Sequence, residues 1–248
     1  MSGATGPVLR LRGVRRAFGD HLVLDGIDLD VAAHEVVALV GSSGSGKSTL
    51  LRTVNLIERI DDGEILLQGR DISDPRIDAD AVRARIGVVF QHYNLFPHLS
   101  VLDNVTLASR LVHRVGRAEA ERRGLELLAS IGLADFARAF PDRLSGGQQQ
   151  RAAIVRAIAT DPELLLLDEV TSALDPELVG EVLALVRSLA DRGTTIVMAT
   201  HEMAFARDVA DRVVFLDAGR IIEDAPARQF FEAPREERTR EFLTRFRA

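Results

Sequence analysis

The sequence predicts an α/β fold with a mixed sheet, an N-terminal antiparallel β subdomain and an inserted α-helical subdomain. Two apolar runs, VVALV (36–40) and LLLL (164–167), are typical of parallel strands that are buried on both faces. Apolar and polar residues alternate in 8–31, which indicates antiparallel strands. The segment 92–160, between the two apolar runs, has the character of a helical insertion.

The other predicted elements follow from periodicity and from turn residues. Helices are predicted at 48–60, 118–132 and 176–193, and strands at 63–69, 86–91, 194–200 and 213–224. The second of these helices stops at Gly132, and the third is amphipathic, with apolar residues at 178, 182, 185, 186 and 189. The arginine- and glutamate-rich tail after Pro234 is predicted to form an exposed helix.

Residues 41–49 read GSSGSGKST and match the phosphate-binding loop G-x-x-x-x-G-K-[ST]. The loop lies between a buried strand and a predicted helix, so its backbone amides can approach an anion closely. Lys47 is expected to reach the β- and γ-phosphates, and the hydroxyl of Ser48 is expected to bind a metal ion. Nucleotide contacts are predicted from Gly41, Ser42, Ser43, Gly44, Ser45, Gly46, Lys47, Ser48 and Thr49.

Two carboxylates, Asp168 and Glu169, end the second apolar run. Asp168 is expected to hold Mg2+, directly or through water. Glu169 is expected to accept a proton from the attacking water or to orient it. An acidic pair that only caps a helix is the alternative reading, and the phosphate-binding loop upstream favours the catalytic one.

A second anion-binding helix start is predicted in LSGGQQQR (144–151). Ser145, Gly146 and Gly147 offer a hydroxyl and unobstructed backbone amides before a helix that is expected to begin near Gln148. Ser145 can cap this helix at the same time.

These motifs, in this order, resemble the ATP-binding subunit of an ABC transporter, and LSGGQQQR matches the signature motif of that family. The resemblance implies a P-loop NTPase core, ATP hydrolysis with Mg2+, and a head-to-tail dimer of two copies with two ATP molecules at the interface. Ser145, Gly146, Gly147 and Gln148 are then predicted to cover the γ-phosphate of ATP held by the second copy. Asp175, in SALD (172–175), is predicted to lie in the loop that crosses this interface, and it also has the pattern of a helix N-cap before proline.

The resemblance assigns roles to three more residues. Gln91 matches the glutamine that contacts magnesium and water and senses the membrane partner. His201 matches the switch histidine that contacts the γ-phosphate. Phe18 matches the aromatic residue that stacks on adenine, although a phenylalanine in a strand is more often a core residue. The predicted catalytic residues are Glu169, His201, Gln91 and Lys47, and the predicted metal ligands are Ser48, Gln91 and Asp168.

Val170 stands where the family usually has a proline directly after the catalytic glutamate. Proline would fix the backbone angle φ, whereas valine adds a backbone donor and leaves a looser turn. We expect a working site in which Glu169 is less firmly placed and turnover is lower.

The similarity runs along nearly the whole chain and is strongest to the ATPase subunits of bacterial polar amino acid importers, in stretches such as 90–105, 144–159, 171–183, 200–221 and 237–243. It implies a peripheral protein at the cytoplasmic face of the membrane, with permease subunits and, indirectly, a solute-binding protein as partners. Tyr93, Leu95, Phe96 and Pro97 are candidate permease contacts, and a plain core or loop role is equally open for each. An ATPase of a mechanotransmission-type complex and a low-turnover regulatory ATP-binding module are the alternative functions.

The composition agrees with a single domain over 1–248, divided into a catalytic core (8–91 and 161–224), a helical subdomain (92–160) and a C-terminal helical tail (225–248). No apolar run reaches the roughly 18 residues that a membrane span needs, and the N-terminus lacks the apolar core of a signal peptide. The absence of cysteine excludes disulfides and thiolate metal sites. The net charge of −6 argues against nucleic acid as a partner.

Overall fold

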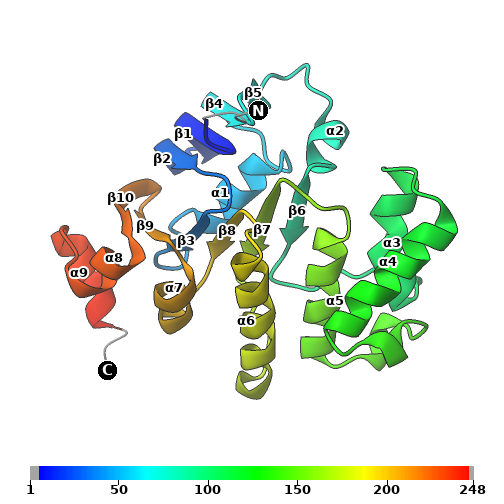
Figure 1. Cartoon of the computed structure of the whole chain (residues 1–248). Coiled ribbons are helices and arrows are strands. Elements are labelled where there is room, and N and C mark those ends of the chain that lie inside the picture. Colours follow the sequence, from blue (N-terminus) through cyan, green and yellow to red (C-terminus); the bar gives the residue numbers. More distant parts are fainter. Residues whose placement is uncertain (1–5, 246–248) are drawn as a thin grey trace.

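The computed structural model describes residues 6–245, so the ends of the predicted 1–248 domain and of the predicted tail lie outside the described residues. Its centre is a six-stranded sheet in the order β10-β9-β3-β8-β7-β6 (Figure 1). The strands are β3 (Val36–Val40), β6 (Ile86–Val89), β7 (Leu164–Asp168), β8 (Ile196–Ala199), β9 (Arg212–Asp217) and β10 (Arg220–Pro226). All neighbours are parallel except β9 and β10, which form an antiparallel hairpin. The predicted mixed sheet is confirmed.

A second, antiparallel sheet packs beyond the first in the order β2-β1-β4-β5. Its strands are β1 (Leu9–Phe18), β2 (His21–Val31), β4 (Asp62–Leu67) and β5 (Arg70–Asp71). The first two form a hairpin in which Phe18 pairs with His21 across the turn. The alternation of apolar and polar residues in 8–31 therefore correctly predicted strands β1 and β2.

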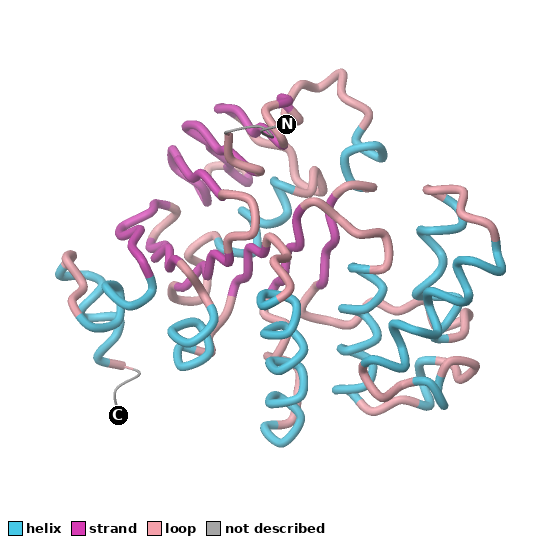
Figure 2. Tube along the Cα trace, viewed as in Figure 1, coloured by secondary structure: helices cyan, strands magenta, loops and turns pink. Residues whose placement is uncertain are grey.

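The helices gather mainly on the other face of the central sheet and at one side of it, as Figure 2 shows. They are α1 (Lys47–Val54), α2 (Ala79–Arg83), α3 (Val101–Leu111), α4 (Arg117–Ser130), α5 (Gly146–Ile158), α6 (Pro176–Asp191), α7 (Met203–Val209), α8 (Ala227–Glu232) and α9 (Glu237–Thr244). Helices α3 and α4 pack on each other and on α5, beside the β6 end of the sheet. Within residues 6–245, no helix combines the length and the apolar character that crossing a membrane would require.

Strand β3 divides its side chains between two apolar cores, as period-two alternation requires. Val36, Ala38 and Val40 pack with the helices α5 to α9, whereas Val37 and Leu39 pack with α1 and the antiparallel sheet. All five are buried, which explains the uninterrupted apolar run in the sequence. Strand β7 divides its leucines in the same way.

The predicted helix at 48–60 is too long, because α1 ends at Val54. Leu56 has a left-handed backbone with φ of +54°, which an α-helix cannot contain. The amides of Ile57 and Glu58 both donate to the carbonyl of Arg52, which closes the helix end.

The sequence correctly predicts a C-terminal helix, but the prediction that this helix is exposed is wrong. The helix forms as α9, but Phe242 and Leu243 are 7% and 5% exposed and belong to the core of the helical face. The ring of Phe242 stacks on that of Phe215 in β9, with ring centres 4.7 Å apart. Phe242 and Leu243 therefore dock a helix whose other residues, apart from the buried Thr239, are exposed.

Candidate active site

The phosphate-binding loop connects the carboxyl end of β3 to the start of α1. Gly44 has φ of +77° and open space on the side where a Cβ would stand, so an anion can approach its backbone. Gly46 has φ of +106°, and a Cβ there would lie 2.9 Å from a methyl group of Leu24. The hydroxyl of Ser45 is buried and has no hydrogen-bond partner among the described residues. The loop therefore offers free polar groups at a helix start, where an anion is favoured.

Lys47 points back into the loop. Its Nζ donates to the carbonyls of Gly41 (3.0 Å) and Ser42 (3.1 Å) and lies 3.7 Å from Oε1 of Glu169. The side chain is only 4% exposed. Burial lowers the pKa of Lys47, and the charges of Glu169 and Asp168 oppose that shift. A buried ammonium held by two carbonyls is available to exchange them for phosphate oxygens.

Ser48 and Asp168 meet although they are 120 positions apart in the chain. The Oγ of Ser48 donates to Oδ1 of Asp168 at 2.7 Å. Burial raises the pKa of Asp168, the hydrogen bond from Ser48 lowers it part of the way back, and the charge of Glu169 adds to the rise. A hydroxyl and a carboxylate are oxygen ligands of the kind that Mg2+ prefers.

Glu169 adopts a left-handed backbone with φ of +48° directly after β7. For a residue with a Cβ this conformation costs roughly 1–2 kcal/mol, so neighbouring bonds must hold it. Its amide donates to the carbonyl of Ala199 (3.0 Å), and its carbonyl accepts from the amide (3.1 Å) and the hydroxyl (2.9 Å) of Ser172. Its Oε1 lies 3.0 Å from Nε2 of His201. Val170, the next residue, is 8% exposed and packs in the core.

The predicted second anion site lies at the start of α5. Ser145 and Gln148 form a reciprocal capping box, with the Ser145 amide donating to Oε1 of Gln148 (2.9 Å) and the Gln148 amide donating to Oγ of Ser145 (3.3 Å). The helix begins at Gly146, two residues earlier than expected. Asp175 occupies the N-cap position of α6 with Pro176 after it, but its side chain makes no capping hydrogen bond.

The described contacts bring together five of the predicted residues beside the phosphate-binding loop and leave Phe18, Gln91, Asp175 and the start of α5 apart. Ser48 is hydrogen-bonded to Asp168, Glu169 contacts both His201 and Lys47, and Asp168 is close enough for its charge to raise the pKa of Lys47. Within residues 6–245, no hydrogen bond or ion pair joins Phe18, Gln91, Asp175 or the α5 start to this cluster. Phe18 is 44% exposed, so a core role for it is wrong. Gln91 is exposed just beyond the end of β6.

The sequence did not predict the hydrogen bond that Tyr93 makes between two segments near the site. The hydroxyl of Tyr93 donates to the carbonyl of Ala173 at 3.2 Å, so the segment after β6 is tied to the segment after β7. A Cβ on Gly146 would lie 2.7 Å from the same hydroxyl. The sequence indicates Tyr93 as a candidate permease contact, but no sequence signal indicates a bond to a residue 80 positions away.

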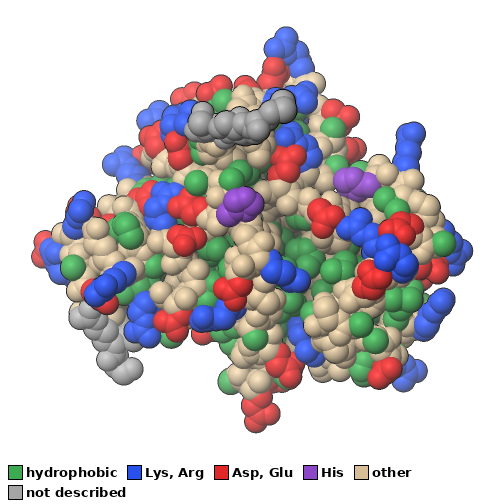
Figure 3. Space-filling model, in the orientation of Figure 1, with side chains coloured by type: hydrophobic (Ala, Val, Ile, Leu, Met, Phe, Trp, Pro, Cys, Tyr) green, Lys and Arg blue, Asp and Glu red, His purple; other side chains and the backbone are tan. Residues whose placement is uncertain are grey.

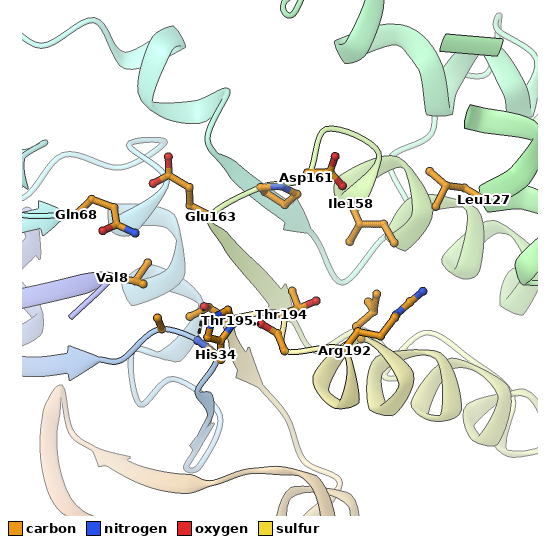
Figure 4. Close-up of a pocket in the computed structure, with 14 residues that line it drawn as sticks. Val8, His34, Gln68, Leu127, Ile158, Asp161, Glu163, Arg192, Thr194 and Thr195 are labelled. Carbon is orange, nitrogen blue, oxygen red and sulfur yellow. Dashed lines mark hydrogen bonds between the residues drawn. The ribbon is translucent and has the colours of Figure 1, made fainter. Parts of the chain in front are cut away.

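A cavity of about 560 Å³ lies at the opposite edge of the central sheet and contains none of the predicted site residues. His34, Glu163 and Thr195, which line it, stand just before β3, β7 and β8, whereas the phosphate-binding loop follows β3 (Figure 4). The side chains of His34, Thr194 and Thr195 lie close together on its floor. The chemistry of the cluster at the carboxyl ends, rather than cavity size, identifies the candidate site, since ligands of open α/β sheets bind outside the carboxyl ends of the strands.

A glycine-rich loop with a buried lysine, facing a hydroxyl–carboxylate pair and a second carboxylate at the end of a parallel strand, defines a nucleoside triphosphate-binding domain. The profile of the ABC transporter family matches residues 24–172. The chain belongs to the ABC transporter family.

Two curated relatives and one solved structure illustrate the similarity. The chain is 50% identical to the glutamine transport ATP-binding protein GlnQ of Geobacillus stearothermophilus, over 94% of this chain and 96% of the relative. It is 47% identical to the glutamate/aspartate import ATP-binding protein GltL of Escherichia coli K12, over 96% and 99%. A dimeric ATP-binding cassette in a post-hydrolysis state with bound ADP and phosphate matches with a TM-score of 0.79 and 33% identity, over 88% of this chain and 98% of that one.

Proposed function

We propose that this chain is the ATP-hydrolysing subunit of an importer of polar amino acids. It acts at the cytoplasmic face of the membrane, as a pair of identical chains bound to permease subunits that receive the amino acid from a solute-binding protein. The observation that carries the proposal is the cluster of Lys47, Ser48, Asp168, Glu169 and His201 at the carboxyl edge of the sheet. The relatives named for glutamine, glutamate/aspartate and cystine transport support the choice of substrate class.

The residues present fit a magnesium ion that arrives with the nucleotide. Ser48 and Asp168 supply one hydroxyl and one carboxylate, and Mg2+ typically takes few protein ligands beside waters and phosphate oxygens. Among residues 6–245 there is no cluster of three or more histidine and acidic side chains that could hold a metal by itself. The bound ion would neutralise phosphate charge, and Gln91 is the third proposed ligand.

The chain's own groups then divide the work of hydrolysis. Lys47 leaves the carbonyls of Gly41 and Ser42 and binds the β- and γ-phosphates, while the amides of the loop cradle them. Glu169 accepts a proton from the attacking water or orients it. His201, 3.0 Å from Glu169, contacts the γ-phosphate and holds the carboxylate in place. Positioning and electrostatic stabilisation account for most of the rate effect in phosphoryl transfer.

A second copy completes the site in this proposal. Ser145, Gly146, Gly147 and Gln148 of one chain cover the γ-phosphate bound by the other, and Asp175 crosses the interface. The amides of Gly146 and Gly147 at the start of α5 have no helical partners and can bind an anion, whereas the amide of Gln148 is capped by Ser145. The dimeric form of the structurally similar cassette supports this arrangement.

The permease is proposed to bind the segment between β6 and α3. Phe96 is 43% exposed there, and Leu95 packs against two cores. On the face in Figure 3, charged side chains of both signs are interspersed, and apolar side chains gather between α6 and the helices α3 to α5. Tyr93 and Pro97 are the other candidate contacts. A mechanotransmission-type complex is the alternative output of the same ATPase.

The test is the steady-state ATPase activity of the purified chain at increasing protein concentration. We expect the activity to rise more than linearly, because the site is shared between two chains. Glu169→Gln should abolish turnover, keep ATP binding and accumulate as a dimer, whereas Glu126→Gln, an exposed glutamate on α4, should behave as the unmodified chain. A Glu169→Gln protein that remains monomeric with ATP and turns over fully would overturn the assignment.

Reconstitution of the chain with its permease tests the substrate class. It also distinguishes an active ATPase from the second alternative, a regulatory ATP-binding module. With its permease in vesicles, the complex should accumulate labelled polar amino acids only when ATP is supplied on the side of this chain. ATP binding without turnover, both alone and with the permease, would favour a regulatory ATP-binding module instead.

A further inference from the structure

The exposed ring of Phe18 rests on an arginine. The guanidinium carbon of Arg16 lies 4.6 Å from the centre of the Phe18 ring, which is cation–π distance. Arg16 is only 20% exposed, whereas Phe18 is 44% exposed. The Nε of Arg16 is buried and has no hydrogen-bond partner among the described residues. One part of the ring is thus covered by a fixed cation, and the remainder is open.

Two carboxylates hold Arg16 in that place. Its Nη2 lies 3.3 Å from Glu58 and its Nη1 lies 2.9 Å from Asp61, both of which follow α1. Asp61 also accepts the amide of Ala17 at 2.6 Å and donates its own amide to the carbonyl of Arg15 at 2.9 Å. The amide of Ala17, with Arg16, lowers the pKa of Asp61. The end of β1 is therefore bonded, through backbone and side chain, to the segment that continues from the phosphate-binding loop and its helix.

The same strand end lies beside the phosphate-binding loop. Arg16 pairs with Leu24 in the β1–β2 register. Leu24 reaches to 2.9 Å from the position of a Cβ on Gly46, so it packs directly on the loop backbone. On the other side, Gly219 in the β9–β10 turn donates its amide to the carbonyl of Ser45 at 3.2 Å, and its own carbonyl accepts the amide of Asp25 in β2 at 2.9 Å. The hairpin that carries Phe18 is thus fixed against the loop from two directions.

We infer that Arg16 is the positioning residue of the adenine platform: clamped by Asp61 and Glu58, it fixes the ring of Phe18 beside the phosphate-binding loop for stacking by the base. This rests on the proposed function, in which Phe18 stacks on adenine. Arg16 touches no part of the nucleotide and acts only through the ring. An exposed aromatic side chain has few packing neighbours, and Arg16 supplies one. The ring of Phe18 is therefore already ordered before the base binds.

If Arg16 formed only an ordinary surface ion pair, its replacement would have a different effect. Exposed pairs contribute little to stability and nothing to the binding of a base. A positioning role instead makes the effect of Arg16 specific for ligands that contain a base, and makes it depend on the presence of Phe18.

The experiment measures calorimetric affinities for a hydrolysis-resistant ATP analogue and for inorganic tripolyphosphate, both with Mg2+. Arg16→Gln should weaken binding of the analogue by about three- to ten-fold, as expected for loss of a cation–π contact, and leave tripolyphosphate unchanged. Arg16→Lys should recover part of the loss, because it keeps the charge but not the planar fork. Arg12→Gln is the matched control, since Arg12 lies on the same strand in an ion pair with Asp30 and is not packed on Phe18. In steady-state hydrolysis, Arg16→Gln should raise KM and keep kcat.

The Phe18→Leu background separates the inference from the proposal beneath it. There, Arg16→Gln should cause no further loss of affinity for the analogue. Equal losses for the analogue and tripolyphosphate, a further loss in the Phe18→Leu background, or wild-type affinity in Arg16→Gln would each overturn the role of Arg16. Unchanged analogue affinity in Phe18→Leu alone would instead overturn the stacking role of Phe18, and the inference with it.

Discussion

The Nζ of Lys47 lies 3.7 Å from Oε1 of Glu169, so the cation of the phosphate-binding loop and the predicted catalytic carboxylate are partners in this structure. Both are largely buried. Phosphate oxygens that bind Lys47 must therefore compete with Glu169 as well as with two loop carbonyls. In the proposed mechanism, Glu169 then keeps His201 as a neighbour and becomes free to act on water.

Replacing Val170 by proline should raise turnover. No hydrogen bond from the Val170 amide is found among residues 6–245, so proline removes no bond there, and it restricts the turn after Glu169. A rigidified loop is typically worth about 0.4–1 kcal/mol, which corresponds to roughly two- to five-fold if it acts on the barrier. We expect kcat to rise by that factor with KM unchanged. Val170→Ala, which does not restrict φ, is the control, and equal kcat values for Val170→Pro and the unmodified chain would show that the turn does not limit turnover.

Gly146→Ala should destabilise the chain through a collision with Tyr93, because the new Cβ would lie 2.7 Å from the tyrosine hydroxyl. The tyrosine tip must then move and lose its hydrogen bond to the carbonyl of Ala173, which typically costs about 0.5–1.5 kcal/mol. Tyr93→Phe removes that hydroxyl, so the cost of Gly146→Ala should be smaller in the Tyr93→Phe background. Urea unfolding of the two single variants and the double variant measures the coupling. Gly147→Ala is the control, because its Cβ would meet Leu178 instead and its effect should simply add to that of Tyr93→Phe.

Asp168→Asn should make the nucleotide-free chain more stable at neutral pH. Burial raises the pKa of Asp168, so the folded state holds its proton more tightly than the unfolded chain does. The free energy of unfolding therefore falls as pH rises from the ordinary pKa through the folded one, and this loss is absent in the variant. Thermal melting should show the variant ahead at pH 7 by more than at pH 4. The added stabilisation by Mg-ATP should be smaller in the variant, and a melting advantage that does not depend on pH would contradict the account.

Glu223→Gln should loosen the C-terminal helix. Glu223 is 6% exposed and accepts the amides of Arg235 (2.9 Å) and Glu236 (3.2 Å) just before α9. Burial would raise its pKa, but these amide donors outweigh burial and lower it. Its stabilising contribution is therefore present above the unfolded pKa and is lost as pH falls through the folded one.

The expected cost of Glu223→Gln is about 1–3 kcal/mol in unfolding free energy at neutral pH, as for hydrogen bonds to a charged group. The cost should shrink in acid. Glu232→Gln, which removes an exposed ion pair with Arg228 on α8, serves as the control and should change stability little. Equal losses in the two variants would show that the amide contacts of Glu223 do not anchor α9.

The fold class was predictable because its signals are local. The apolar run of β3 is uninterrupted and that of β7 ends only at Asp168, and the glycine spacing of the phosphate-binding loop is tied to backbone geometry. The end of α1 was not predictable, because Leu56 has a left-handed backbone and leucine is not a residue type that signals this conformation. The burial of α9 rests on Phe242 meeting Phe215, which its charged composition conceals.

The candidate site was predictable in its residue types but not in its contacts. The pairing of Ser48 with Asp168 follows from two motifs whose chemistry requires a common ligand. The clamp of Asp61 on Arg16 joins residues 45 positions apart, and neither lies in a motif. Contacts of this kind depend on how β1 and α1 pack, and that packing is decided by the whole fold.

The left-handed turn at residue 169 decides which way two neighbouring acids face. A pleated strand sends successive side chains to opposite faces of the sheet. Leu167 faces the helices α5 to α9, and Asp168 faces α1, where it meets Ser48. One more extended residue would have pointed Glu169 back among those helices, into apolar surroundings. Reversal of the backbone hand at that residue keeps it beside Lys47, so two consecutive carboxylates serve one side of the sheet.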